Sequence, residues 1–187
     1  AKELTIKLVF LRPLGLRLET LEFLYDGRID FGIVSTPFEA RQEIQSIPVR
    51  EIHNVFIAGP KFAPVLSGRK IAYEELMSYP CIFLEKKTST RQFMDRFLAE
   101  RGICLEPEFE LATSDMIVQF AKRNLGIGCL MSDFAKEAVS SKEVFRIEFE
   151  EEMPSRRFCL VAQGRACMSP AAEKLFRELA AEKAELT

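Results

Sequence analysis

The chain has 187 residues, of which 48% are hydrophobic and 29% are charged, and its formal net charge at pH 7 is -2. This composition is typical of a globular protein with a hydrophobic core. Because a duplex-binding surface is normally strongly basic, the charge argues against direct binding of nucleic acid, and no apolar run approaches the roughly 20 residues of a membrane-spanning helix.

Strands and helices alternate along the chain. A helix over residues 16–26 carries Leu21 and Leu24 on one face and ends at Gly27, and Ile29–Val34 follows as an apolar run typical of a buried parallel strand. The other expected strands are residues 4–10, 44–47, 53–58, 81–84, 109–112, 127–131, 144–149 and 157–162. The other expected helices are residues 73–78, 91–101, a segment from about 114 to 123, 134–139, and a last helix begun by Ser169-Pro170. The alternation predicts an α/β fold with a mostly parallel sheet, and such sheets bind ligands at the carboxyl ends of their strands.

Glycines mark the ends of several expected elements. Gly102 is expected to end the helix over residues 91–101, Gly126 to cap the next helix, and Gly128 to allow close packing. The segment Gly126-Ile127-Gly128 follows a helix and precedes a strand, which is the reverse of a phosphate-binding loop.

The five cysteines and the single histidine exclude several kinds of site. An odd number of cysteines without a CxxC motif favours reduced thiols over a disulfide framework or a cysteine-only zinc site. Cys159 and Cys167 could form a redox pair, although two buried small hydrophobic residues are the simpler interpretation. His53 alone cannot make a His-rich metal site, and we expect it to be structural. There is no GxSxG motif for a Ser-His-Asp mechanism. We expect no metal, no cofactor and no catalytic residue.

A series of sequence landmarks occurs in a specific order along the chain. They are LxxLYDGRIDFGIV, HNVFIAGP, EELMSYPCIFLE, TSTRQFMDRFLAERG, FELATSDMIVQFAKRNLGIGCL, FCLVAQ and SPAAEKLFREL. In this order the chain resembles, over nearly all of its length, the effector-binding domain of LysR-type transcriptional regulators. That domain is similar to type 2 periplasmic binding proteins, with two Rossmann-like α/β lobes joined by two crossover strands.

The resemblance implies a discontinuous first lobe. Lobe I would comprise residues 1–58 plus 163–187 and lobe II residues 59–162, together forming one effector-binding domain. Family domains start with one more strand and a helix before the strand expected at residues 4–10, and this strand and helix are not visible in the sequence. A helix-turn-helix domain is also absent, so we expect DNA contact only through such a domain outside this chain. The resemblance further implies a homodimer, which is a tetramer in full-length form, and the reduced thiols favour a cytoplasmic location.

The resemblance also implies a small-molecule site between the lobes. Hydroxyl and N–H groups at a helix start can hold a carboxylate, and Arg12, Lys86, Lys87 and Arg91 favour an anionic effector. The expected ligand-binding residues are Leu14, Gly15, Ser35, Thr36, Pro37, Thr88, Ser89, Thr90, Thr113, Ser114, Cys129 and Met131. Local alternatives stay open for all of them: helix capping for the hydroxyl groups at residues 88–90 and 113–114, turns at residues 14–15 and 35–37, and core packing near residue 130.

Two other functions are compatible with such a fold. The first alternative is a solute-binding protein of a transport system. The second is an enzyme on a similar scaffold, with Cys81 or Cys129 as a nucleophile, but no paired carboxylates stand out as acid and base. We therefore expect a sensor domain and not an enzyme.

Overall fold

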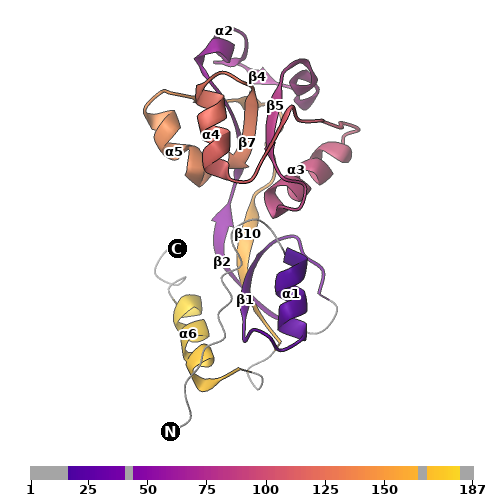
Figure 1. Ribbon diagram of the computed structural model, residues 1–187, viewed down its shortest axis with the longest axis vertical. Helices are drawn as coiled ribbons and strands as arrows, with labels where there is room; N and C mark the ends of the chain where they lie inside the picture. Colours follow the sequence, from indigo (N-terminus) through magenta and orange to yellow (C-terminus); the bar gives the residue numbers. More distant parts are fainter. Residues whose placement is uncertain (1–16, 41–43, 164–167, 182–187) are drawn as a thin grey trace. The chain divides into compact units, whose positions relative to one another are not determined.

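The structure is a computed structural model that describes residues 17–40, 44–163 and 168–181 (Figure 1). The chain divides into two compact units: unit 1 consists of Ala1–Ile52 and Arg156–Thr187, and unit 2 consists of His53–Ser155. The chain therefore leaves unit 1 once, builds unit 2 without interruption, and returns. The predicted strand at residues 4–10, together with Leu14, Gly15 and Cys167, lies outside the described residues.

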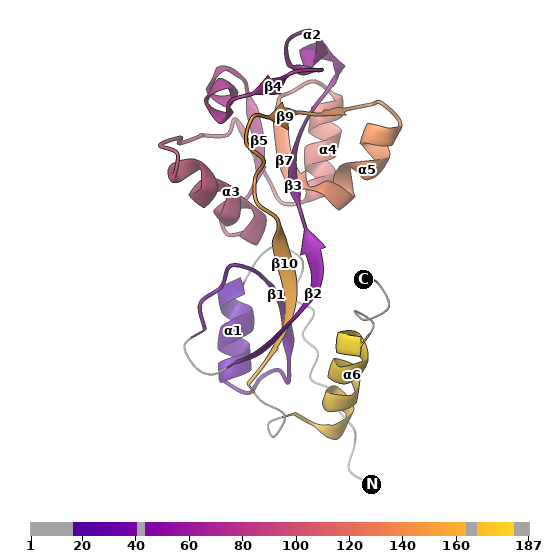
Figure 2. The ribbon, with the colours of Figure 1, turned by 180° about the vertical axis from the view of Figure 1, so that it is seen from behind.

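Unit 1 contains a three-stranded antiparallel sheet with the strand order β1-β10-β2. Leu21 and Leu24 pack with Val34 on one face of this sheet, and Phe176 packs with Leu160 on the other. Helices α1 and α6 thereby cover opposite faces (Figure 2). The elements of unit 1 within the described residues are α1 (Arg17–Tyr25), β1 (Gly32–Ser35), β2 (Gln45–Ile52), β10 (Arg156–Ala162) and α6 (Pro170–Ala181).

The start of unit 1 corrects one prediction and confirms another. The expectation that residues 29–34 form a buried parallel strand is wrong. In the described residues β1 pairs with β10, which returns from unit 2 and runs antiparallel to it. Ile33 is also 55% exposed. The predicted end of α1 at Gly27 is confirmed: Gly27 has a φ of +64°, and Arg28 N donates to Phe23 O at 2.8 Å.

Unit 2 contains a five-stranded mixed sheet with the order β6-β5-β7-β3-β8 and a two-stranded parallel sheet, β4-β9. Its strands are β3 (Asn54–Ala58), β4 (Lys70–Ile71), β5 (Cys81–Leu84), β6 (Phe109–Leu111), β7 (Ile127–Met131), β8 (Phe145–Arg146) and β9 (Glu148–Phe149). Its helices are η1 (Pro60–Phe62), α2 (Ala63–Leu66), η2 (Tyr73–Ser78), α3 (Ser89–Ala99), α4 (Ser114–Lys122) and α5 (Ser132–Ser140). The single strand expected at residues 144–149 is two strands, because the chain leaves the edge of β3 after Arg146 and pairs with β4.

The two faces of the five-stranded sheet are covered by different helices (Figure 1, Figure 2). Met94 and Phe97 of α3 pack with Phe83 on one face. Ile117 of α4 and Ala135 of α5 pack with the residues that point to the other face. The alternating side chains of the buried strands β5 and β7 thus supply two hydrophobic cores.

The sheet pairings place the unit boundaries several residues away from the predicted lobe boundaries. β3 was expected in lobe I, yet it pairs with β7 and β8 of unit 2. β10 was expected in lobe II, yet it pairs with β1 and β2 of unit 1. Both strands are apolar enough for either core, so their composition does not identify their partners.

Of the two glycines that follow α4, one has the expected role and the other does not. Asn124, with a φ of 60°, takes the left-handed position after α4 that was expected for Gly126. Gly128 is confirmed as a packing glycine, because a Cβ there would lie 2.4 Å from Ile117 Cγ2. Among the described residues, no helix is both long and apolar enough to cross a membrane.

Candidate functional site

The carboxyl ends of three strands meet at one edge of the five-stranded sheet. β5 runs parallel to β6 and β7, with Leu84 opposite Leu111, so the three strands end at the same edge. β3 runs antiparallel to β7, and its first residue, Asn54, lies opposite Met131. The starts of α3, α4 and α5 therefore lie along this edge, which we call the carboxyl edge of unit 2.

Half of the predicted ligand-binding residues lie at the carboxyl edge. They are Thr88, Ser89, Thr90, Thr113, Ser114 and Met131. They come from three separate loops, and the parallel strand order brings these loops together, as in other open α/β sheets.

The start of α3 lies two residues earlier than predicted. Thr88 is its N-cap: the Thr88 Oγ1 atom accepts a hydrogen bond from Arg91 N at 3.2 Å and donates to Glu85 O at 2.9 Å. Ser89 and Thr90, which were expected to precede the helix, form its first turn. The Thr88 hydroxyl is thus engaged in capping, and Thr88 is 3% exposed.

The three helices that start at the carboxyl edge differ in charge. α4 carries Asp115 and α5 carries Asp133 in the first turn, whereas the first turn of α3 has no acidic residue. Two exposed lysines, Lys86 and Lys87, precede α3. Because a helix N-terminus has positive potential that acidic residues offset, this potential is least compensated at α3.

Arg91 is not the free cation that the sequence suggests. Its side chain is 3% exposed, and its Nε atom lies 2.8 Å from both carboxylate oxygens of Asp95. Its Nη1 atom donates to Leu84 O at 3.2 Å and to Glu110 Oε1 at 3.4 Å. The sequence could have identified Asp95 as a partner of Arg91, because the two residues are four apart on α3. It gives no local signal for Glu110, which lies in β6 and is distant along the chain.

The family of the chain follows from comparison with known proteins. Residues 14–184 match the family model described as LysR substrate binding domain. The chain belongs to this family. Several solved regulatory domains of LysR-type regulators have the same α/β fold, which resembles type 2 periplasmic binding proteins. The fold class expected from the sequence is therefore confirmed.

Two structural neighbours of this LysR domain were solved with a small molecule bound. The regulatory domain of Synechocystis PCC6803 CcmR in complex with 2-PG has a TM-score of 0.74 and 20% identity, covering 87% of this chain and 77% of that chain. The effector-binding domain of QuiR in complex with shikimate has a TM-score of 0.69 and 18% identity, covering 89% and 76%.

The curated relatives are longer proteins. The uncharacterized HTH-type transcriptional regulator YeiE of Escherichia coli K12 is 30% identical over 112 residues, which are 60% of this chain and 37% of that protein. The RuBisCO operon transcriptional regulator of Allochromatium vinosum is 23% identical over 177 residues, 91% of this chain and 58% of that protein. The LysR domain thus spans about a third to just over half of the curated relatives that it matches.

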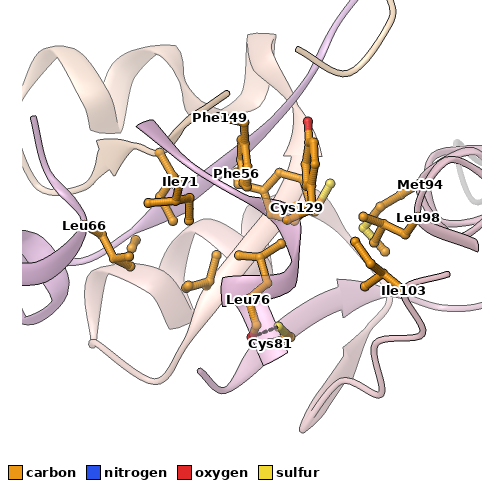
Figure 3. Packing of buried hydrophobic residues seen from close by; sticks show 14 of the residues in the cluster. Phe56, Leu66, Ile71, Leu76, Cys81, Met94, Leu98, Ile103, Cys129 and Phe149 are labelled. Atoms are coloured by element: carbon orange, nitrogen blue, oxygen red, sulfur yellow. Dashed lines mark hydrogen bonds between the residues drawn. The ribbon is translucent and has the colours of Figure 1, made fainter. Parts of the chain in front are cut away.

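Cys129 lies in the core of the LysR domain and not at the carboxyl edge. It is 2% exposed and belongs to the cluster that contains Phe56 and Phe149 (Figure 3). Cys81, in the same cluster, is also 2% exposed, and burial raises the pKa of its thiol to about 12. Both thiols therefore lie in the hydrophobic core of unit 2.

The predicted site residues of unit 1 lie at the end of β1. Ser35 is 4% exposed, and its Oγ atom accepts a hydrogen bond from Arg156 Nη1 at 3.4 Å. The Thr36 Oγ1 atom accepts one from Arg157 N at 2.9 Å, and Pro37 is exposed. These contacts fit the strand-ending turn that the sequence left open as an alternative. Leu14 and Gly15, the remaining two predicted residues, are not described.

A groove of about 490 Å³ lies beside the carboxyl edge, between α3 and the segment that leads to β6. Its charged lining residues are Lys86, Arg91, Asp95, Glu106 and Glu110. None of the predicted hydroxyl-bearing residues lines it. No group of three or more His, Cys, Asp or Glu side chains within the described ranges could hold a metal ion, and His53 is exposed.

Proposed function

We propose that this LysR domain senses a small anionic effector and that unit 2 holds the anionic group at the N-terminus of α3. One observation favours α3 over α4 and α5 as the anion site. Of the three helices that start at the carboxyl edge, only α3 has no acidic residue in its first turn, and it follows Lys86 and Lys87. Helix N-termini of this kind bind carboxylates and phosphates through backbone N–H groups and positive potential.

The family supports the proposal. The regulatory domain of CcmR and the effector-binding domain of QuiR were each solved with a small molecule bound, and both have the fold of this chain. The fold alone supplies no contact residues. The carboxyl-edge residues Ser89, Thr90, Thr113, Ser114 and Met131 are our candidates in unit 2. Ser35, Thr36 and Pro37 are our candidates in unit 1, where the family resemblance implies further contacts.

The whole regulator would add a DNA-binding domain. Some of the curated relatives, YeiE among them, are named as HTH-type regulators, and this chain matches only part of their length. We propose that effector binding controls a helix-turn-helix domain of the same protein, in a cytoplasmic homo-oligomer. The relatives are transcriptional regulators, so they do not favour the alternative of a transport protein.

We also propose that the domain is not an enzyme. The two cysteines considered as nucleophiles, Cys81 and Cys129, are each 2% exposed, and the high pKa of the Cys81 thiol disfavours a reactive thiolate. The matched relatives are regulators, which agrees with this proposal.

The test is a calorimetric titration with matched charged and neutral ligands. The domain is titrated with 2-PG, with shikimate, and with a panel of small carboxylates and phosphates, and each carboxylate is compared with its neutral methyl ester. At least one anion should bind with one-to-one stoichiometry, and its neutral counterpart should bind at least about tenfold more weakly, a difference of about 1.4 kcal/mol. Equal binding of ester and acid, or no binding across the panel, would contradict the proposal.

A further inference from the structure

Arg91 is a cation in an unfavourable place. It is the third residue of α3, where the positive end of the helix dipole repels a cation, and its side chain is 3% exposed. Burial of a charge is costly unless the charge is paired and hydrogen-bonded. Partners around Arg91 must therefore compensate for the free-energy cost of burying its charge at a helix N-terminus. The elements to which those partners belong are the elements that Arg91 connects.

The partners of Arg91 belong to three elements of unit 2. Asp95 lies one turn further along α3 and pairs with Nε. Leu84 O, at the end of β5, and Glu110, in β6, both accept from Nη1. The guanidinium carbon also lies 5.3 Å from the centre of the Phe83 ring. The pair with Asp95 acts within one helix, whereas the contacts with Leu84 and Glu110 connect that helix to two strands.

We propose that Arg91 is a positioning residue for the anion site, which together with Glu110 fixes the N-terminus of α3 at the ends of β5 and β6. This inference rests on the proposed function. Arg91 N also donates to the Thr88 Oγ1 atom, so the residue whose side chain is tied to the sheet also donates the N-cap hydrogen bond from its backbone. The Arg91 guanidinium pairs with Asp95 and Glu110 and not with the effector. Arg91 therefore supports effector binding only by fixing the position of α3.

The positioning role and direct contact predict opposite effects for Glu110→Gln. If Arg91 contacted the anion, loss of the competing carboxylate would free the guanidinium and tighten binding. If Arg91 positions α3, the same change loosens the helix start and weakens binding, although it removes a negative charge. Glu110 is 39% exposed in its side chain, so its isosteric replacement should fold.

The first arm of the test is calorimetry with 2-PG and shikimate on the wild-type domain, on Glu110→Gln and on Glu106→Gln. Glu106 is an exposed acid of the same groove, so it controls for the change in charge. We expect Glu110→Gln to weaken binding about three- to tenfold, as for other coupled ion pairs, and Glu106→Gln to leave it unchanged or slightly tighter. Tighter binding by Glu110→Gln, or equal values for both variants, would overturn the inference.

The second arm needs no ligand. Amide hydrogen exchange is measured for Arg91, Gln92 and Phe93, with the amides of α4 as internal reference. Glu110→Gln should speed amide exchange at the start of α3 alone. Arg91→Lys keeps the positive charge but loses the planar set of guanidinium N–H donors, and it should give an intermediate effect. Unchanged exchange at the start of α3, or a uniform increase through unit 2, would refute the positioning role. If the wild-type domain binds neither 2-PG nor shikimate, that result counts against the proposed function for these two ligands. The hydrogen-exchange result still decides whether Arg91 positions α3.

Discussion

Single residues at the carboxyl edge combine structural and candidate binding roles. The hydroxyl of Thr88 caps α3, and its contribution to anion binding is therefore indirect: it defines where the helix begins. Thr113 caps α4 in the same manner, since its Oγ1 atom accepts from Met116 N at 3.4 Å. Ser89 and Ser114 are the first residues of these two helices and occupy equivalent positions. This equivalence allows a matched comparison of the two helix starts.

A negative charge at the first position of α3 should strongly weaken anion binding and leave the fold intact. Ser89→Asp adds an acid where the helix dipole favours it by about 0.3–1 kcal/mol, so stability should be kept or slightly raised. The same charge should repel a nearby bound anion and weaken its binding by more than about tenfold.

The control is Ser114→Asp, at the first position of α4, whose first turn already contains Asp115. Calorimetry on both variants, together with thermal unfolding, separates the two helix starts. An equal loss of affinity in both variants would place the anion elsewhere along the edge, and an unchanged affinity in Ser89→Asp would exclude α3 as its site.

At the scale of elements, local patterns predicted the buried strands well. The strands at residues 81–84 and 127–131 have the expected bounds, because each is a short apolar run between polar residues and helix-ending signals. The start of α3 was misplaced since three consecutive hydroxyl-bearing residues, Thr88 to Thr90, can each cap a helix. The choice among them depends on the contact of Thr88 with Glu85 and on the contacts of Arg91 with Leu84 and Glu110, which lie on other elements.

The close approach of α4 to β7 gives a stability prediction. Gly128→Ala places a Cβ 2.4 Å from Ile117 Cγ2, and this overpacking should lower the free energy of unfolding by about 1–3 kcal/mol. Ile117→Ala alone should also destabilise, because it leaves a cavity under α4.

The double variant distinguishes the clash from two independent losses. Because Ile117→Ala removes the Cγ2 atom that the new methyl group meets, the double variant should be less destabilised than the sum of the single variants by about 0.5–3 kcal/mol. Urea denaturation of all four proteins measures this difference. Strictly additive values would mean that β7 or α4 shifts to avoid the contact.

At the scale of the whole molecule, the order of motifs along the chain identified the family, and the family match over residues 14–184 covers parts of both units. The crossings between the units were misplaced, because the strands β3 and β10 are apolar enough for either core and only their pairing assigns them. Unit 2 is one continuous segment and contains the carboxyl edge, so half of the predicted ligand-binding residues are held by one sheet. The candidate anion site can therefore be examined within unit 2.

The most direct measurement is an NMR titration of the ¹⁵N-labelled domain with the anion that binds most tightly in the calorimetric screen. We predict that the largest amide shifts fall on Ser89, Thr90 and Arg91 in the first turn of α3, with smaller shifts at Thr113 and Ser114. Shifts that gather on the groove around Ile103 to Pro107, with an unperturbed first turn of α3, would contradict the proposal that α3 holds the effector.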